Sequence, residues 1–397
     1  MHIVFIAPRY HTNQHYWVKA LRDAGHTVSF WVRKRAGAEE HALCTPRVVE
    51  PEDDGAPAGA GVGRTGGSRA LSGVRSADAR GGQAGPGKRR RSKRRRRWSS
   101  DAFRALLADE KPNAVVIRNP AEPFSRAAFA PVRESGARVV LYSQGPLFRR
   151  EPLLRRLASA RLQRRMGGAP WITPVRGDRR PPAEHEPANR YFVPFVMEPD
   201  RQAEAAIDER PFCPGGVRRV LMVAKYMPRK NHLLLVRALH ALAGRFEISL
   251  ELVGGGGRSE YERAREEVAA YVREHRLDWV TLRPPMPYAR LQEHMRGFDL
   301  FVLPSRNEAV GVSLLEAMGK GLPVVCSSTT GARDYVEDRG NGRIFESDSL
   351  DDLRLTLEEL LAGPERLREM GRRSLELVRT VHSPEAFLRR FLPLIEG

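Results

Sequence analysis

Short apolar segments alternate with helix-like segments along this chain, and the alternation restricts the fold more than any other feature. Residues 2–7 form an apolar run, as expected of a strand buried on both faces of a sheet. Apolar residues at helical spacing follow over 17–24, with Gly25 at the position of a helix C-cap. Residues 28–32 then alternate as a second strand. Strands separated by helices are joined by right-handed crossovers, so this order predicts a parallel sheet.

The same alternation resumes further along. The other expected strands cover residues 114–117, 139–142, 220–224, 248–252, 280–282, 300–303 and 322–326. A polar connection after Pro194 divides the strands into two series. We therefore predict two Rossmann-like α/β domains that face a cleft, over residues 1–195 and 196–380, with a C-terminal helix over 381–397. In such sheets ligands bind at the carboxyl ends of the strands.

The alternation stops between residues 34 and 98. This segment is dense in Gly, Ala, Arg and Ser and holds almost no aromatic or β-branched clusters. Such a composition cannot bury enough apolar surface to offset the entropy of ordering the chain. We predict a mostly disordered basic insertion in the first domain. It ends in the run Lys88–Arg97, followed by Trp98.

The basic run dominates the charge of the chain. The net charge is +19, from 67 Lys and Arg against 48 Asp and Glu, and the run Lys88–Arg97 alone supplies nine of those cations. Such a run binds an anionic membrane surface or nucleic acid, or it is an inert solvated segment. No aromatic stacking platform accompanies it, which disfavours nucleic acid.

Other features exclude several classes of protein. No stretch approaches the ~20 apolar residues that cross a bilayer, and the apolar start is too short for a signal peptide. Cys44, Cys213 and Cys326 are odd in number and widely spaced, which argues against a disulfide framework and a zinc site. We expect a reduced, cytoplasmic protein, located at the inner face of the membrane if the basic run binds lipid.

The loop after the next-to-last expected strand combines three properties of a ligand site. Glu308 lies at the carboxyl end of the strand, and Gly311 lets a ligand approach the backbone closely. The free N–H groups of Val312 and Ser313 at the start of the next helix can bind an anion. Glu316, one turn inside that helix, can accept hydrogen bonds from a pair of sugar hydroxyls. The alternative is that each glutamate is an ordinary surface residue near a helix start.

This stretch resembles a known family. Glu308 and Glu316, with seven residues between them, and the run Ala317–Val325 that follows look like the E-x7-E signature of the group 1 glycosyltransferases. The resemblance extends from about residue 220 to 345, and more weakly to residues 1–32. These are retaining, nucleotide-sugar-dependent enzymes of the GT-B fold. The resemblance therefore implies an N-terminal acceptor-binding domain and a C-terminal nucleotide-sugar-binding domain.

The resemblance also assigns roles on the donor side. It places Glu308 near the sugar and its phosphate and implies that Glu316 binds the ribose hydroxyls of the nucleotide. The backbone of Gly311, Val312 and Ser313 would hold the diphosphate.

Two lysines complete the expected donor site. Lys225 follows the strand 220–224, where the family usually has Arg, and Lys230 matches a family Lys. Both would neutralise the diphosphate, although Lys lacks the bidentate fork of Arg. Asn231 replaces the Gly that usually follows. The alternative for this turn is a solvated basic loop, which is our interpretation of Arg229.

Two further segments resemble donor-side elements of the family. Gly254 and Gly255, in a run of four glycines, match the Gly-containing loop beside the nucleotide, and a flexible connection is the alternative. Met286 follows Arg283-Pro284-Pro285, where the family places backbone contacts to the base.

The N-terminal half matches the family less closely. The family often has a Gly-Gly pair after the first strand, where this chain has His11-Thr12-Asn13-Gln14-His15. Asn13 tolerates a left-handed conformation, and His15 is a candidate on the acceptor side, although a lone loop His is more often solvated. Gln144 stands where the family tends to have a His. Its amide can bond a sugar hydroxyl but cannot exchange a proton near neutral pH.

The expected activity follows from the resemblance. The chain would move a sugar from a UDP- or GDP-sugar to a hydroxyl of a glycan, lipid-linked or small-molecule acceptor, with retention, in cell-surface polysaccharide or glycolipid synthesis. Glu308 and Lys230 are the expected catalytic residues. We expect no metal and no cofactor, because cationic side chains can stabilise the leaving phosphate and the chain has no Asp-x-Asp. The alternatives are a non-enzymatic protein that binds nucleic acid or an anionic surface through the Arg-rich segment, and a transferase fold that only binds.

The last helix has two expected placements. Apolar residues recur on one face from Phe387 to Ile395, after a helix start at Ser383-Pro384. The resemblance implies that this helix crosses back onto the first domain, and packing on its own domain is the alternative.

Overall fold

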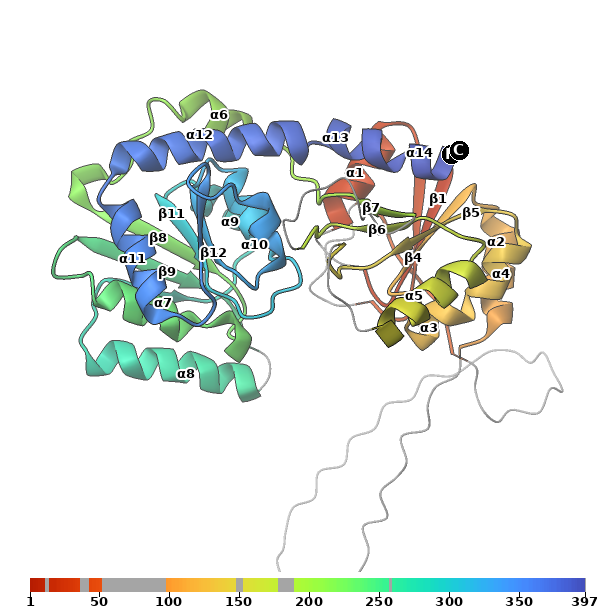
Figure 1. Ribbon diagram of the computed structural model, residues 1–397, viewed down its shortest axis with the longest axis horizontal. Helices are drawn as coiled ribbons and strands as arrows, with labels where there is room; N and C mark the ends of the chain where they lie inside the picture. The colour runs from red at the N-terminus through yellow and green to blue at the C-terminus, as the bar shows by residue number, and fades with distance from the viewer. Residues whose placement is uncertain are drawn as a thin grey trace, which may run out of the picture.

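The computed structural model describes residues 1–10, 14–35, 43–51, 98–147, 153–177, 189–256 and 259–396. These residues form two α/β units, each built on one sheet with helices packed against it (Figure 1). Every pairing between the named strands is parallel. The central strands are buried and apolar on both sides, which is the pattern of a parallel sheet between helix layers.

The N-terminal sheet has the order β3-β2-β1-β4-β5-β6-β7. Its strands are β1 (His2–Ala7), β2 (Thr27–Val32), β3 (Arg47–Val48), β4 (Ala114–Arg118), β5 (Arg138–Tyr142), β6 (Trp171–Thr173) and β7 (Arg190–Phe192). The helices of this unit are α1 (His15–Asp23), α2 (Ser100–Glu110), α3 (Pro123–Ala127), α4 (Phe129–Glu134) and α5 (Leu153–Arg165).

The C-terminal sheet has the order β10-β9-β8-β11-β12-β13. Its strands are β8 (Arg218–Val223), β9 (Ile248–Val253), β10 (Val280–Arg283), β11 (Leu300–Leu303), β12 (Val324–Ser327) and β13 (Gly342–Phe345). The helices after β7 are α6 (Arg201–Ala206), α7 (His232–His240), α8 (Ser259–Glu274), α9 (Tyr288–Met295), α10 (Val312–Met318), α11 (Leu350–Leu361), α12 (Pro364–Val381), α13 (Pro384–Phe391) and α14 (Pro393–Glu396). Short 3-10 turns are η2 (Pro214–Gly216), η3 (Pro228–Lys230) and η4 (Gly331–Tyr335).

The predicted fold class is confirmed: the chain has two parallel-sheet α/β domains. The helix expected over 17–24 is α1, which buries Trp17, Val18 and Leu21 against the sheet. Gly25 follows it with φ +83°, a conformation that a residue without a Cβ adopts at little cost. The apolar spacing therefore located this helix, and the glycine located its end.

The boundaries predicted for the insertion are wrong at its beginning. We expected disorder from residue 34, but residues 43–51 add an edge strand, β3, beside β2. Val49 is 2% exposed, and its N–H donates to the carbonyl of Val32 over 2.9 Å. A two-residue strand leaves no periodic signal, so composition over the whole stretch concealed it.

The other end of the insertion is also anchored. Trp98 forms an antiparallel bridge with Pro51, and its ring meets Phe124 edge-on at 5.0 Å. The chain thus leaves and re-enters the domain at one place. Residues 52–97, with the run Lys88–Arg97, lie outside the described residues.

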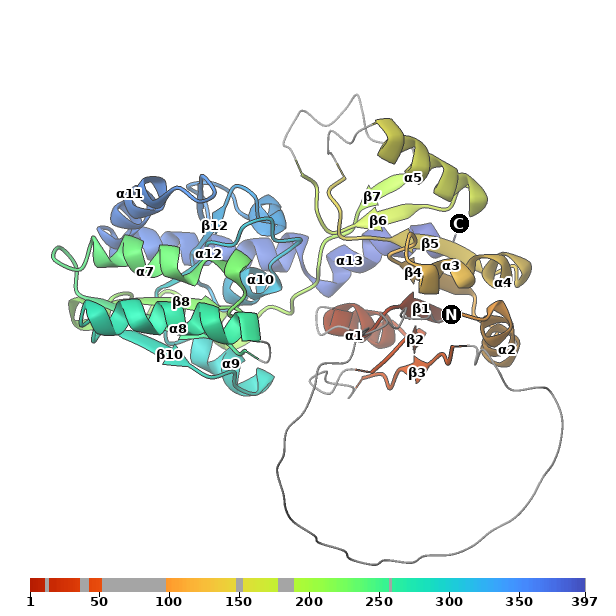
Figure 2. The ribbon, with the colours of Figure 1, turned by 90° about the horizontal axis from the view of Figure 1, so that it is seen from below.

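The C-terminal end of the chain packs on the N-terminal unit (Figures 1 and 2). The ring of Phe387 on α13 stacks on Trp17 of α1 at 5.1 Å, and Phe391 lies 6.4 Å from the same ring. Just before α13, the Nδ1 atom of His382 lies 2.9 Å from the carbonyl oxygen of Phe195. The structure therefore shows the last helix on the first domain, and the chain crosses between the units twice, at neighbouring places.

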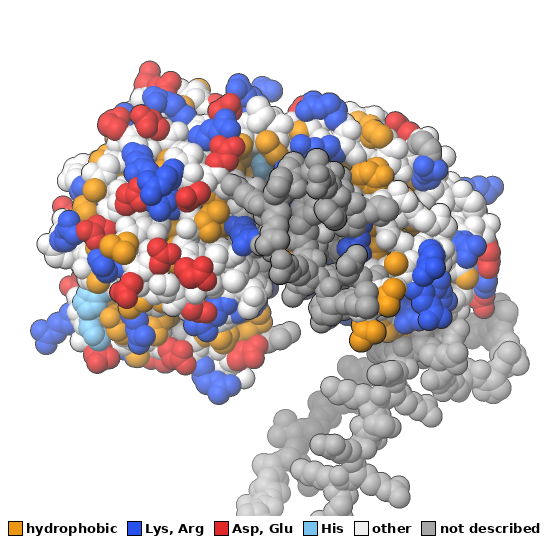
Figure 3. Space-filling view, in the orientation of Figure 1, with side chains coloured by type: hydrophobic (Ala, Val, Ile, Leu, Met, Phe, Trp, Pro, Cys, Tyr) orange, Lys and Arg blue, Asp and Glu red, His pale blue; other side chains and the backbone are white. Residues whose placement is uncertain are grey.

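Helix α5 lies on the surface. Leu154 and Leu157 are 80% and 54% exposed, and Arg161, Arg164 and Arg165 are exposed near its end. Figure 3 shows Lys and Arg side chains gathered over this helix. Among the described residues, no helix combines the length and apolarity needed to span a bilayer.

Candidate active site

The carboxyl edges of the two sheets face each other. After β6, the backbone N–H groups of Arg176 and Gly177 donate to the carboxylate of Asp334 on η4, over 2.6 and 2.9 Å. The hydroxyl of Tyr335 donates to the carbonyl of Pro174 over 2.6 Å. Because η4 follows the carboxyl end of β12, loops from both carboxyl edges meet between the units. This is where ligands bind in folds of this class.

The sheet order explains which loops come together on the C-terminal side. Strand β8 lies between β9 and β11, so the segments that follow these three strands are neighbours. They carry Lys225 and Lys230, Gly254 and Gly255, and Glu308 respectively. Residues more than 80 positions apart in sequence therefore meet at one edge.

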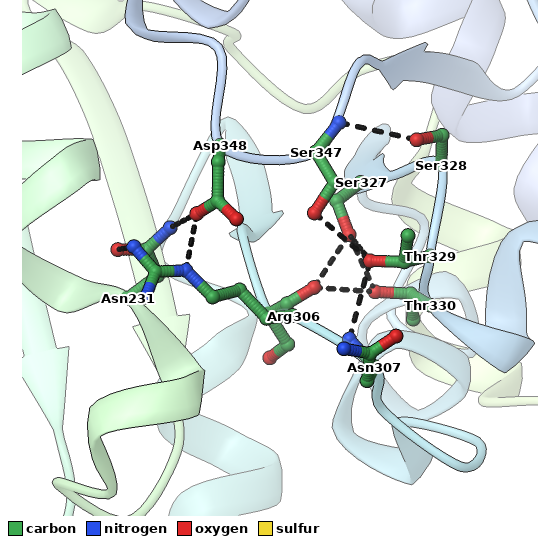
Figure 4. Close-up of polar contacts among 10 residues, drawn as sticks. Asn231, Arg306, Asn307, Ser327, Ser328, Thr329, Thr330, Ser347 and Asp348 are labelled. Carbon is green, nitrogen blue, oxygen red and sulfur yellow. Dashed lines mark hydrogen bonds and ion pairs between the residues drawn. The ribbon is translucent and has the colours of Figure 1, made fainter.

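A polar network fixes the loop that carries Glu308 (Figure 4). The N–H of Asn307 donates to the hydroxyl of Thr329 over 3.2 Å, and that hydroxyl donates to Ser347 over 2.9 Å. Arg306 pairs with Asp348, which also accepts a hydrogen bond from Asn231 over 3.0 Å. These contacts join the segments after β8, β11, β12 and β13.

Two backbone bonds complete the support of Glu308. Its carbonyl accepts from the N–H of Gly331 over 2.8 Å, and the N–H of Arg306 donates to the carbonyl of Arg229 over 2.7 Å. A Cβ on Gly331 would lie 2.0 Å from the carbonyl oxygen of Ala309, so only glycine allows this approach. The backbone of Glu308 is thus tied both to η4 and to the turn that carries Lys230.

Lys230 and Glu308 form a largely buried ion pair. The Nζ atom of Lys230 lies 2.5 Å from a carboxylate oxygen of Glu308, and the two side chains are 12% and 11% exposed. Burial lowers the pKa of Lys230, against the opposing effect of the Glu308 charge. The charged form of a lysine in such a place is stabilised further when a second negative charge approaches it.

Arg229 corrects our interpretation of the turn. We expected a solvated side chain, but its guanidinium pairs with the same oxygen of Glu308 that Lys230 contacts. Asn231, the residue after Lys230, has φ +60°. This left-handed conformation explains why the family usually has glycine there and why asparagine is tolerated. This left-handed residue ends η3 and begins α7.

The remaining predicted donor residues surround this pair. Lys225 is exposed two residues after the end of β8. A Cβ on Gly254 would lie 1.9 Å from the carbonyl oxygen of Ala224, and one on Gly255 would lie 3.0 Å from Pro285. These two glycines therefore serve close backbone packing between the ends of β8, β9 and β10. Met286 is half-buried beside them and packs against the core.

Gly311 begins α10 with φ +86°. A Cβ there would come within 2.7 Å of Leu303, so this position also needs glycine. Val312 and Ser313 are the first two residues of α10, which has seven residues. The structure thus places the backbone segment that we assigned to the diphosphate next to the Glu308 loop.

Glu316 takes part in a contact between the two units. It is hydrogen-bonded to the hydroxyl of Tyr288 on α9, which lies 3.0 Å from the hydroxyl of Tyr16 on α1. Burial raises the pKa of Glu316 to about 7, although Tyr288 and Lys320 act in the opposite direction. The carboxylate expected to hold a ribose is therefore occupied by a tyrosine in this structure.

The acceptor-side predictions fall in the N-terminal unit. Asn13 lies outside the described residues. His15 is the first residue of α1, and its ring meets that of Tyr16 at 5.2 Å. Gln144 donates to the hydroxyl of Tyr142 over 3.2 Å. The structure shows no contact between His15 and Gln144 in the described part of the chain.

Sequence reasoning missed several residues of this region. Tyr16 and Tyr288 gave no signal because an isolated tyrosine on an amphipathic helix resembles a core residue. Arg118, the last residue of β4, was not singled out, yet the residue is only 7% exposed and its guanidinium lies 5.5 Å from the ring centre of Tyr142. A cation at the carboxyl end of a buried strand was the signal that could have found it.

The C-terminal unit is similar to a known protein family. Residues 205–376 match the family described as glycosyl transferases group 1. The match supports the resemblance that the sequence indicated for this part of the chain.

One curated relative is the GDP-mannose-dependent alpha-(1-6)-phosphatidylinositol monomannoside mannosyltransferase of Mycolicibacterium smegmatis. It is 31% identical over 197 residues, which are 47% of this chain and 49% of the relative. The aligned region spans half or less of the curated relatives that were compared.

Solved structures with the same fold cover the whole chain. A glycosyltransferase from Rickettsia africae superimposes with a TM-score of 0.69 at 13% identity, over 100% of this chain and 97% of that one. Anabaena HepE in complex with UDP and glucose gives 0.67 at 11% identity, over 100% and 99%. At these identities the likeness concerns the fold, which is GT-B.

Proposed function

We propose that this protein is a glycosyltransferase that moves a sugar from a nucleoside diphosphate sugar to a hydroxyl of an acceptor. The observation that carries the proposal is the buried pair of Lys230 and Glu308 at the carboxyl edge of a group 1 glycosyltransferase domain. The donor is a UDP- or GDP-sugar. The relative from M. smegmatis is named as GDP-mannose-dependent, and the Anabaena structure holds UDP.

Each donor-side residue has a proposed task. When the sugar leaves, negative charge builds on the departing diphosphate, and Lys230 and Lys225 stabilise that charge. Glu308 holds Lys230 and faces the sugar, while Glu316 accepts hydrogen bonds from the ribose hydroxyls. The backbone at Gly311 allows the diphosphate to approach, because no Cβ occupies that space.

The stereochemical course and the pathway belong to the same proposal. The acceptor hydroxyl attacks the anomeric carbon on the face that the diphosphate leaves. The leaving phosphate takes the hydroxyl proton, so the configuration is retained and no covalent carboxylate intermediate forms. Lysine charges replace a metal ion in this scheme. We propose a hydroxyl acceptor of cell-surface polysaccharide or glycolipid synthesis.

A donor titration tests the proposal. The full chain is mixed with UDP- and GDP-sugars while its thermal unfolding is followed, because a ligand that binds the folded state raises the Tm by mass action. At 100 times its Kd a donor adds about 2.7 kcal/mol to the free energy of unfolding. A mass-spectrometric screen against hydroxyl acceptors then detects transfer. The absence of both donor binding and transfer would contradict the proposal.

The raised pKa of Glu316 predicts a pH dependence of donor affinity. Only the carboxylate form can accept two ribose hydrogen bonds. With a pKa of about 7, affinity should rise roughly tenfold between pH 6 and pH 8. Titration calorimetry with the intact nucleotide sugar, whose diphosphate does not titrate in this range, measures it.

The matched variant is Glu316→Gln, whose weaker affinity should be flat over the same range. Because the folded-state pKa is raised, ionisation of Glu316 lowers folding stability. The contribution of Glu316 to folding stability is therefore largest at a pH below the pKa that this residue has in the unfolded chain, and it declines as the pH rises towards 7. A wild-type affinity that is independent of pH would contradict the role of Glu316.

A further inference from the structure

A pocket lies at the carboxyl edge of the N-terminal sheet, apart from the donor residues. Its volume is about 370 Å³, and it is lined by Pro8, Arg9, Arg33, Lys34, Arg118, Asn119 and Glu122. These residues follow or end β1, β2 and β4, three adjacent strands. The pocket therefore belongs to the half of the molecule that does not carry Lys230, Glu308 and Glu316.

The lining of this pocket is strongly cationic. Four of its side chains are Arg or Lys, and Glu122 is its one carboxylate. Glu122 already accepts a hydrogen bond from Asn119 over 2.9 Å. Among the described residues, no carboxylate forms an ion pair with Arg33, Lys34 or Arg118. The positive charge of the pocket thus exceeds what its own acidic group can balance.

Arg118 shows that the charge is built into the fold. Arg118 is only 7% exposed. One of its terminal nitrogens donates a hydrogen bond to the Oε1 atom of Gln14 over 3.1 Å. Its Nε atom is buried and has no hydrogen-bond partner within the described ranges, and neither has the Nε2 atom of Gln14, which is 0% exposed. A buried guanidinium without a counter-charge is costly, so a native fold retains one where an anion completes it.

We infer that this pocket binds a phosphate ester group of the acceptor. A phosphate dianion matches the excess of positive charge, and an arginine fork hydrogen-bonds phosphate oxygens in two places at once. Arg118 holds the anion from within, and Arg33 and Lys34 hold it from the exposed rim. The inference rests on the proposed function, because the donor occupies the other domain and leaves this edge to the acceptor.

The first test measures phosphate binding directly. Inorganic phosphate is titrated against the full chain by calorimetry, with the donor nucleotide at saturation so that the donor site is filled. We expect the double variant Arg33→Gln, Lys34→Gln to weaken phosphate binding at least tenfold, because it removes two charge-assisted contacts. The variant Lys34→Arg keeps the charge and should keep the affinity.

A matched control removes two charges from the opposite edge of the same sheet. Lys111 and Arg138 are exposed beside the amino ends of β4 and β5, so Lys111→Gln with Arg138→Gln changes the net charge equally. This control should bind phosphate as the wild type does. Equal phosphate binding by the wild type and by the double variant Arg33→Gln, Lys34→Gln (the rim variant) would overturn the inference. The test does not need a variant of the buried Arg118, such as Arg118→Met, which could fail to fold.

The second test compares acceptors. For the wild type, kcat/KM should be about 10- to 100-fold higher for a hydroxyl acceptor that bears a phosphate ester than for its dephosphorylated form. In the rim variant most of this preference should disappear, because the KM for the phosphorylated acceptor rises. Equal kcat/KM for both forms would overturn the inference. A preference for soluble phosphate esters identifies a free acceptor, and a response only to vesicles of anionic phospholipid identifies a lipid headgroup.

Donor affinity separates the two proposals. The rim variant should keep the donor Kd of the wild type, since Arg33 and Lys34 lie outside the donor domain. If no donor binds the wild type, the proposed function fails. The phosphate titration is then repeated without nucleotide, and it still tests whether the pocket binds phosphate.

Discussion

The variant Lys230→Ala is expected to transfer sugar about 100 to 1000 times more slowly than the wild type, while it still folds. One preorganised donor to a developing negative charge contributes about this factor. Lys230 lies 2.5 Å from a carboxylate oxygen of Glu308, and its side chain is largely buried. Single-turnover kinetics at saturating donor measures the effect on the chemical step.

Two comparisons make this result specific. Lys230→Arg keeps the charge and should recover part of the rate, whereas Lys111→Gln removes an exposed lysine and should leave the rate unchanged. Glu308→Gln should also be slow, because it frees both Lys230 and Arg229 from their shared carboxylate. Wild-type transfer by both Lys230→Ala and Glu308→Gln would dismiss the site.

The second large effect concerns stability. Asp200→Ala is expected to lower the free energy of unfolding by about 3–5 kcal/mol, the usual result of breaking a buried ion pair on one side. The Asp200 side chain is 5% exposed and pairs with Lys320 over 2.7 Å and with Arg296 over 2.6 Å. It also caps α6 by accepting from two backbone N–H groups. Urea unfolding measures the loss.

Acid titration provides an independent check of Asp200. Burial alone would raise its pKa, but the hydrogen bonds from Lys320 and Arg296 outweigh this and hold the pKa below its ordinary value of 3.8. The stabilisation is therefore present above that value and is lost as the pH falls through the lower, folded-state pKa. Asp208→Ala is the matched control, because that carboxylate is 70% exposed in its pair with Arg372. A loss as small as that of the control would contradict this role.

The sequence predicted the architecture because parallel sheets leave strong periodic signals. Each expected strand was found, and Glu308 and Gly311 lie in the expected loop after β11, with Glu316 in the helix that follows. Strands β3, β6 and β7 and the edge strand β13 were not predicted. The first three have two or three residues each and β13 has four, too few for a period of two to be visible.

The sequence predicted where the site residues lie better than it predicted which side chains they contact. Strand order places Lys230 near Glu308, but the ion pair of Arg229 with the same carboxylate leaves no signal in the sequence. The contact of Tyr288 with Tyr16 depends on how two domains meet, which no local pattern encodes. The pocket around Arg118 likewise needs three separate strands to be assembled before its charge is apparent.

The packing of α13 on α1 determines how this protein could be recombined with a relative. Because Phe387 and Phe391 cover Trp17, a hybrid joined only near residue 195 would pair one parent's first domain with the other parent's closing aromatic helix. An exchange of acceptor preference between parents should therefore move residues 1–195 together with residues 384–396. The N-terminal unit, to which we assign the acceptor, is thus completed by a stretch of chain nearly 200 residues further on.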